Sequence, residues 1–165
     1  GRIYLLLAQP ISRTKIVWQK WVAMVVTFTV IHAALLVGII SVVALINESM
    51  PLNKVVAGTV MCFLLTTAAG SLTLALGFAL GRKGLTTMLI TTYVFGSYLL
   101  TSFAAQIDWL KHVEPVSLFH YYKASDAIKF GYSTSHLVAM LAISITAVIL
   151  GSVIFGNRDI GTHKA

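Results

Sequence analysis

Long apolar stretches separated by short polar links dominate the pattern of this chain. Four stretches contain no Asp, Glu, Lys or Arg: residues 21–47, 55–81, 84–107 and 130–157. A hydrocarbon core about 30 Å thick needs about 20 apolar residues at a helical rise of 1.5 Å each, and every stretch is long enough. Inside lipid the backbone must satisfy its own hydrogen bonds, which favours helices. The pattern predicts an all-α polytopic membrane protein with spans at 21–46, 55–80, 85–107 and 136–156.

Two of the remaining segments carry amphipathic patterns of their own. Residues 9–20 mix apolar with polar side chains and lead into Trp18 and Trp21, whose indoles favour the headgroup level. We expect a short surface helix there, either a plain anchor or a docking element. Residues 108–135 are interrupted by Pro115, and Ser117 is suited to be the N-cap of an aromatic-rich run. We expect short outer interfacial helices over 108–135 and a polar tail over 157–165.

The basic residues are distributed unevenly between the two sides of the predicted membrane. The N-terminal segment, the 81–84 link and the tail together carry eight Lys and Arg, against four in the other two links. By the positive-inside rule, both ends of the chain are expected to be cytoplasmic, in a multi-pass protein of the cell membrane. The formal net charge of +7 then follows from topology. No nucleic-acid partner is expected, because the basic residues do not gather in a folded soluble patch.

His32 is an ionisable residue within a predicted span, so we consider two roles for it. It falls near the middle of span 21–46, where a polar side chain is costly and normally faces protein. One interpretation is a substrate or proton contact. The other, which we favour, is a neutral imidazole hydrogen-bonded to a Ser or Thr of a neighbouring helix, because no span contains a carboxylate. The missing carboxylates also argue against a proton-coupled secondary transporter.

Small and aromatic residues in spans 55–80 and 85–107 have two interpretations as well. Runs of Thr, Ala, Ser and Gly allow helix backbones to approach closely in lipid, so they predict packing between helices. Tyr93, Phe95 and Tyr98 either line a substrate path or pack against neighbours.

No catalytic constellation stands out. The single cysteine, Cys62, lies in the middle of a span and is expected to be a buried apolar residue. His112 and His120 have no organised carboxylate or Cys beside them, so we expect no metal site. The chain has no phosphate-binding GxxxxGK[ST] loop and no dinucleotide fingerprint. We expect a protein that is not an enzyme and holds no cofactor.

Both ends of the chain resemble one known family. Residues 5–13, LLLAQPISR, followed by Lys20 just before a span, are similar to a stretch in the permease subunits of type-2 ABC transporters. Residues 155–160, FGNRDI, resemble the closing motif of the same permeases. The family's layout between these landmarks has three spans, outer amphipathic helices and a last span. The chain thus resembles the C-terminal four-span portion of such a permease.

The resemblance implies roles for particular residues. The region 9–20 would be the coupling helix that docks on a separate ATP-hydrolysing subunit. The residues implied for coupling are Pro10, Ile11, Ser12, Arg13, Thr14 and Lys15. Arg158 and Asp159 would form a cytoplasmic cap or ion pair at the exit of the last span.

The resemblance also implies a mechanism and partners. Closure of two ATPase subunits would pull on the coupling helices and switch two permease halves, this chain and a second copy or a homologue, between inward- and outward-facing states, with ATP-driven export as the expected use. The family usually has six spans, and the chain starts at Gly1 within an apolar segment, so we expect it to be part of a longer protein. The alternative is a non-transporting membrane scaffold, or an immunity or assembly subunit, that packs with partner helices.

Overall fold

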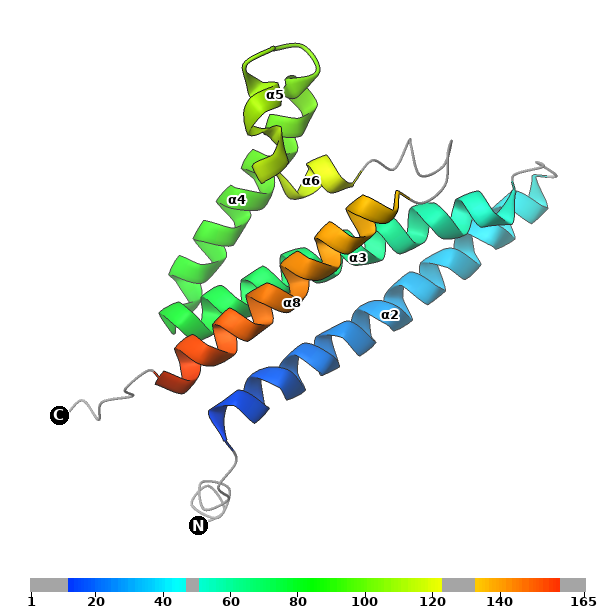
Figure 1. The fold of residues 1–165 in the computed structure, drawn as a ribbon. Coiled ribbons are helices and arrows are strands. Elements are labelled where there is room, and N and C mark those ends of the chain that lie inside the picture. Colours follow the sequence, from blue (N-terminus) through cyan, green and yellow to red (C-terminus); the bar gives the residue numbers. More distant parts are fainter. Residues whose placement is uncertain (1–11, 47–50, 123–132, 158–165) are drawn as a thin grey trace.

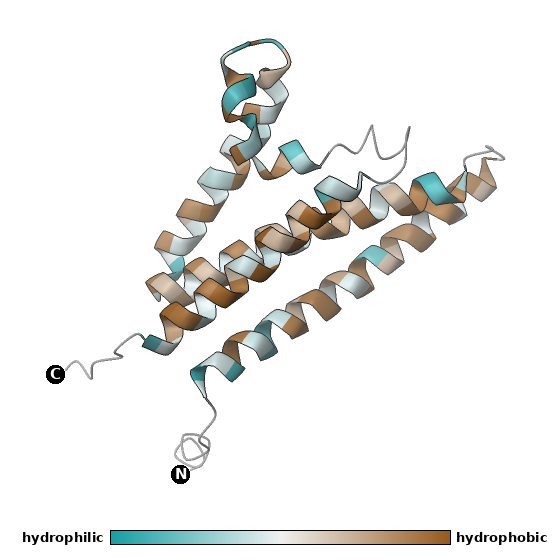
Figure 2. Ribbon diagram, in the orientation of Figure 1, coloured by the Kyte–Doolittle hydropathy of each residue, from teal (hydrophilic) through white to brown (hydrophobic). Residues whose placement is uncertain are grey.

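The computed structural model describes residues 12–46, 51–122 and 133–157, and all the regular structure in these ranges is helical. Four long helices have the length and composition to cross a membrane. They are α2 (Arg13–Leu45), α3 (Leu52–Leu80), α4 (Lys83–Ala104) and α8 (Thr134–Asn157). Three short elements follow α4: α5 (Leu110–Val113), the 3-10 turn η1 (Glu114–Val116) and α6 (Leu118–Tyr121). Figure 2 shows that the long helices are apolar along most of their length.

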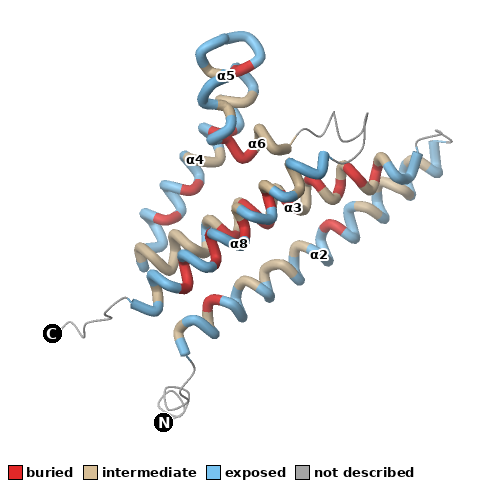
Figure 3. The backbone as a smooth tube through the Cα atoms, viewed as in Figure 1, coloured by how far each residue is buried: buried red, intermediate tan, exposed pale blue. Residues whose placement is uncertain are grey.

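Helices α3 and α8 lie side by side and form the centre of the bundle, with α2 packed along both of them (Figure 1). Helix α4 contacts α3 near the link between them and then diverges (Figure 1). The short elements after α4 fold back, so that α6 contacts both α3 and α8. Buried residues therefore concentrate on α3 and α8, whereas α2 and α4 are mostly exposed (Figure 3).

A glycine makes the sharp reversal between α3 and α4 possible. Gly81 has φ 62° and ψ 15°, and its N–H donates to the Gly77 carbonyl at 2.9 Å. This left-handed conformation carries no Cβ penalty in glycine, which is why glycine so often ends a helix. Helix α4 begins two residues later, so the link stays short and keeps the two helices in contact at this end.

Small side chains allow α3 and α8 to pack closely. Ala68 and Ser71 of α3 are fully buried, and Ser144 of α8 is 1% exposed. A Cβ added at Gly151 of α8 would lie 2.8 Å from the Cα of Ala75 in α3. In lipid, where apolar tails compete equally for apolar side chains, such close backbone approach is a main source of helix association.

The end of the bundle at α5 and α6 is held by Ser117. Its hydroxyl accepts from the N–H of Phe119 at 3.1 Å, as expected for the N-cap, and donates to the carbonyl of Ser97 in α4 at 2.8 Å. The Thr101 hydroxyl oxygen lies 2.7 Å from the Ser117 hydroxyl oxygen. Because Ser117 donates its own proton to Ser97, Thr101 is the donor in this second contact. This fully buried serine fixes α6 against α4.

The prediction of an all-α protein with four helices that can span a membrane is confirmed, and two predicted details need correction. Residues 13–20 do not form a separate surface helix. They are the first turns of α2, because Ser12 is the N-cap and no glycine or proline interrupts the helix before Gly38. The outer helices are single turns in the described part, because Pro115 lies inside the tight turn η1 rather than between two longer helices. Residues 9–11 and 123–132 lie outside the described ranges.

The close approach of α3 and α8 predicts the effect of filling Gly151. Gly151→Ala should destabilise the fold by about 1–3 kcal/mol, because the new methyl group meets backbone of Ala75 that cannot rotate away. The thermal unfolding midpoint of the purified protein in detergent measures this. Gly96→Ala in α4 is the matched control, since a Cβ there meets nothing within 4 Å. Equal midpoints for the two variants would contradict the packing described here.

Candidate functional site

The start of α2 contains four of the residues predicted to couple to an ATPase. Ser12 accepts a hydrogen bond from the N–H of Lys15 at 3.3 Å and so fixes the first turn. Thr14 and Lys15 are exposed, whereas Arg13 is half-buried and interacts within the protein. Val17, one turn further, is 1% exposed and anchors the helix in the bundle. The exposed start of α2 thus leads directly into a packed segment.

The other predicted site residues, at the two ends of the chain, lie outside the described ranges. Pro10 and Ile11 precede the described residues, and Arg158 and Asp159 follow them. The described end of α8 lies on the same side of the bundle as the start of α2 and the α3–α4 link (Figure 1). That shared side is the one on which the sequence predicts the basic residues.

Trp21 connects the beginning of α2 to α3 by a hydrogen bond. Its indole N–H donates to the Ser71 hydroxyl of α3 at 2.8 Å, and Ser71 donates in turn to the Thr67 carbonyl at 2.7 Å. The ring of Trp18 packs edge-on against Trp21 with centroids 5.6 Å apart. Sequence reasoning treated both indoles as headgroup anchors and missed this interhelical bond. Ser71, a polar residue within an apolar span, was the signal that a partner donor was needed.

A second polar contact between α2 and α3 involves His32. Its Nδ1 lies 2.8 Å from the Phe28 carbonyl, which can only accept, so Nδ1 carries a proton. Nε2 lies 3.5 Å from the Thr66 hydroxyl of α3, and the ring packs edge-on against Phe63. These contacts with Thr66 and Phe63 of α3 are those expected of a histidine that serves to pack two helices together. A pocket of about 250 Å³ adjoins the ring and is lined mainly by apolar side chains.

The aromatic residues of α4 have mixed surroundings. The Tyr93 hydroxyl donates to the Val116 carbonyl at 2.8 Å, and Tyr98 packs edge-on against Phe119. Both therefore contact the folded-back segment 110–121, which we call the outer segment after its predicted position. Phe95 is 61% exposed and lines a depression between α3 and α4. The tyrosines therefore hold the outer segment, and Phe95 and Tyr98 are the aromatic side chains of α4 that line the depression.

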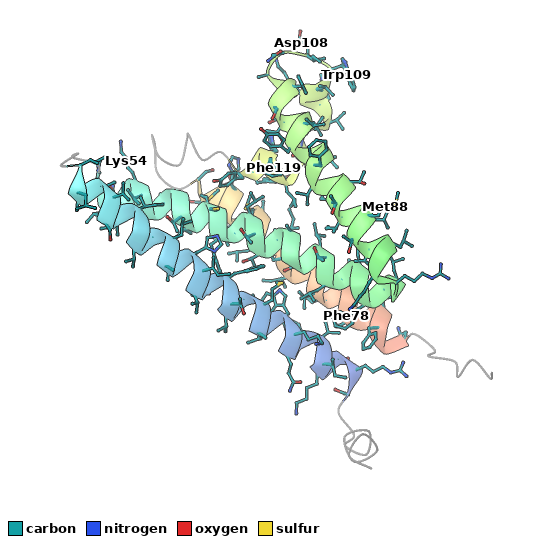
Figure 4. All side chains as sticks on the ribbon, turned by 180° about the vertical axis from the view of Figure 1, so that it is seen from behind. Lys54, Phe78, Met88, Asp108, Trp109 and Phe119 are labelled. Carbon is teal, nitrogen blue, oxygen red and sulfur yellow. The ribbon has the colours of Figure 1, made fainter. Side chains whose placement is uncertain are left out.

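Two depressions lie between α3 and the diverging α4. The one near the Gly81 reversal has a volume of about 460 Å³, and the one near Phe119 about 490 Å³. Thr73 lines both, so they are adjacent. Figure 4 shows Phe119 at the outer end of this space and Phe78 toward the other end. We call the two depressions together the α3–α4 groove.

The outer side has a cluster of ionisable and aromatic rings. Nδ1 of His120 lies 3.1 Å from a carboxylate oxygen of Glu114 but is not aligned for a hydrogen bond, so the contact is one of charge when the ring is protonated. The ring of His120 also packs against Tyr121 and His136. Burial raises the pKa of the nearby Tyr122, and the Cys62 thiol adds to this rise. Within the described ranges, no three His, Cys, Asp or Glu residues are arranged to hold a metal ion.

The Trp21–Ser71 bond generates a stability prediction. Trp21→Phe should lower the free energy of unfolding by about 0.5–1.5 kcal/mol, the usual value of an interhelical hydrogen bond. In a double-mutant cycle with Ser71→Ala, the second substitution should cost little once the first is present. Unfolding midpoints in detergent give the four values. Trp18→Phe is the control and should show no coupling to Ser71→Ala. Strictly additive effects of Trp21→Phe and Ser71→Ala would contradict the bond.

Comparison with known proteins identifies the family. The model of the family described as ABC-2 family transporter protein matches residues 2–149. The match includes the start of α2, helices α3 and α4, the outer segment and most of α8, and it ends before the motif at 155–160. No curated protein matches the chain, and neither does any solved structure. Because the match covers well over half of its residues, the chain belongs to the ABC-2 family of transporter proteins.

Proposed function

We propose that this chain is a membrane-spanning permease subunit of an ATP-driven transporter, coupled through the start of α2 to a separate ATPase subunit. Its ends and the 81–84 link lie in the cytoplasm, and the protein works in the cell membrane. The observation that carries the proposal is the position of Ser12–Lys15 at the exposed start of a helix that continues through the bilayer, in a chain of the ABC-2 family. ATP hydrolysis belongs to the partner, since the sequence offers no phosphate-binding loop.

The length of α2 supports its use as a lever. Its 33 residues give about 50 Å at 1.5 Å per residue, whereas a hydrocarbon core is about 30 Å thick. The helix is therefore long enough to cross the membrane and still project from it. No break separates the projecting turns from the span, so a push on Lys15 moves the segment that carries Trp21 and His32.

The contacts of α2 favour its movement as a unit. It is bound to α3 by the bond from Trp21 to Ser71 and by the contact between His32 and Thr66, while most of its surface is exposed. Force from an ATPase would thus reach α3 and α8 through these two polar contacts and through the packing of α2 along both helices. In the proposed mechanism, a second permease copy completes the translocation pathway, and the two copies alternate between inward- and outward-facing states.

The cargo proposed for this pathway is amphipathic or apolar. The exposed aromatic Phe95 and the Thr-lined side of α4 present no charge along the groove between its ends. A scaffold subunit would have the same packing but would recruit no ATPase, so the association with an ATPase separates the two functions.

The first prediction tests coupling. Lys15→Glu should reduce co-purification of the ATPase with the permease by about tenfold or more, because it replaces an exposed cation with an anion in the docking segment. Quantitative immunoblotting of the purified complex measures the ratio. Lys54→Glu makes the same charge change at the opposite end of the bundle (Figure 4) and should leave the ratio unchanged. A wild-type protein that recruits no ATPase with or without nucleotide would support the scaffold function instead.

The second prediction tests orientation. In a Cys62→Ala background, Val113→Cys should react with a membrane-impermeant thiol reagent in intact cells, because Val113 is exposed in the outer segment. Gly84→Cys, at the exposed start of α4, should react only after the cells are permeabilised. The reverse pattern would place both chain ends outside the cytoplasm and exclude docking of α2 on a cytoplasmic ATPase.

A further inference from the structure

The α3–α4 groove has a polar end and an apolar end. Arg82 and Lys83 line it where α4 begins, next to Gly77 and Phe78 of α3. Toward the outer side, Ile90, Val94 and Phe95 line it, and Phe119 stands at its end. A ligand that fits this groove has a polar group at the Arg82 end and an apolar body extending from it.

Two of the five hydroxyl-bearing residues that line the groove use their hydroxyl groups within their own helices. The Thr73 hydroxyl donates to the Ala69 carbonyl at 2.7 Å, and the Thr86 hydroxyl donates to the Arg82 carbonyl at 3.0 Å. These two threonines therefore present methyl groups and satisfied oxygens to the groove. Together with the apolar side chains of Ile90, Val94 and Phe95, they form a surface that suits hydrocarbon.

The two cations at the polar end face no carboxylate in the described part of the chain. Arg82 and Lys83 are both exposed. The two carboxylates in the described ranges, Asp108 and Glu114, lie beyond the other end of α4, where Asp108 pairs with Lys111 and Glu114 contacts His120. The charge of the groove's polar end is therefore complementary to an anion.

The groove is long enough to hold a lipid tail. From Lys83 to Tyr98 the rise along α4 is about 22 Å at 1.5 Å per residue. One leaflet contributes about 15 Å of a 30 Å hydrocarbon core. A single acyl chain that starts at the level of Lys83 and crosses one leaflet thus stays within the groove and ends near Val94.

We propose that the α3–α4 groove binds one acidic phospholipid. Its phosphate contacts Arg82 and Lys83, and one acyl chain lies between α3 and α4 past Gly77. The lipid comes from the leaflet on the Arg82 side, which is the cytoplasmic leaflet in the proposed orientation. It fills the space left where α4 diverges from α3 and so supports the position of α4, independently of which cargo is carried and of whether an ATPase binds.

Native mass spectrometry of the purified protein, exchanged against phosphatidylglycerol or phosphatidylcholine, tests the head group. The wild type should retain one phosphatidylglycerol in preference to phosphatidylcholine. The double variant R82Q/K83Q should bind phosphatidylglycerol about 30-fold more weakly, given about 1 kcal/mol for each cation near an anionic lipid. The matched control K15Q/K20Q removes two exposed cations from the same end of the bundle, outside the groove, and should retain the lipid.

Gly77→Leu tests the tail. A Cβ at Gly77 meets only a methyl group of Thr86, at 3.9 Å, so the variant should fold, while the rest of the leucine side chain occupies the groove. It should lose the retained phosphatidylglycerol although both cations remain. Gly96→Leu, on α4 outside the groove lining, is the control and should retain it.

Three results would overturn the proposal. Equal losses in R82Q/K83Q and K15Q/K20Q would mean that general surface charge attracts the lipid. Retention by Gly77→Leu would place the lipid elsewhere. A change in the oligomeric state of Gly77→Leu, with no change in bound lipid, would show that a helix of another copy fills the groove. Unfolding midpoints of all variants serve to confirm that each is folded.

Discussion

The absence of water inside the bilayer is the constraint on which this structure depends. The backbone groups hydrogen-bond to each other in helices, and several side-chain hydroxyls within the spans donate to a carbonyl four residues earlier, as Thr27, Thr59 and Ser144 do. Little polar capacity is left to hold one helix to another. The helices are joined instead by the close fit of small residues between α3 and α8 and by a few interhelical hydrogen bonds.

The helices of the bundle are held together by different kinds of contact. Close backbone packing at Gly151 holds α3 and α8 together, and α2 packs along both of them and adds the Trp21–Ser71 bond and the contact at His32. Helix α4 is held at its two ends, by the reversal at Gly81 and by the Ser117 network.

The sequence predicted the long helices well, because charges and apolar length are read directly from it. The reversal near Gly81 and the N-cap at Ser117 were also accessible, since each depends on local chemistry. The continuity of residues 13–20 with the span was missed, because an amphipathic pattern at an interface is compatible with a surface helix or with the end of a span. The role of Trp21 was missed because an indole near an interface suits lipid headgroups and a buried partner equally.

The candidate site was less predictable than the fold. The position of Lys15 at an exposed helix start follows from local sequence, and His32 beside a threonine was among the interpretations considered. The α3–α4 groove was not foreseen, because it results from the angle at which α4 leaves α3. That angle depends on long-range contacts of the outer segment with α3, α4 and α8, which hydropathy and spacing do not encode.

In the proposed function, the start of α2 touches an ATPase and transmits its movement. Site-specific photo-crosslinking from position 15 in intact membranes tests this most directly, with a crosslinker at position 54 for comparison. The account predicts a crosslink from position 15 to a nucleotide-binding subunit, and none from position 54. A crosslink from neither position to such a subunit, while the permease is folded and in the membrane, would contradict it.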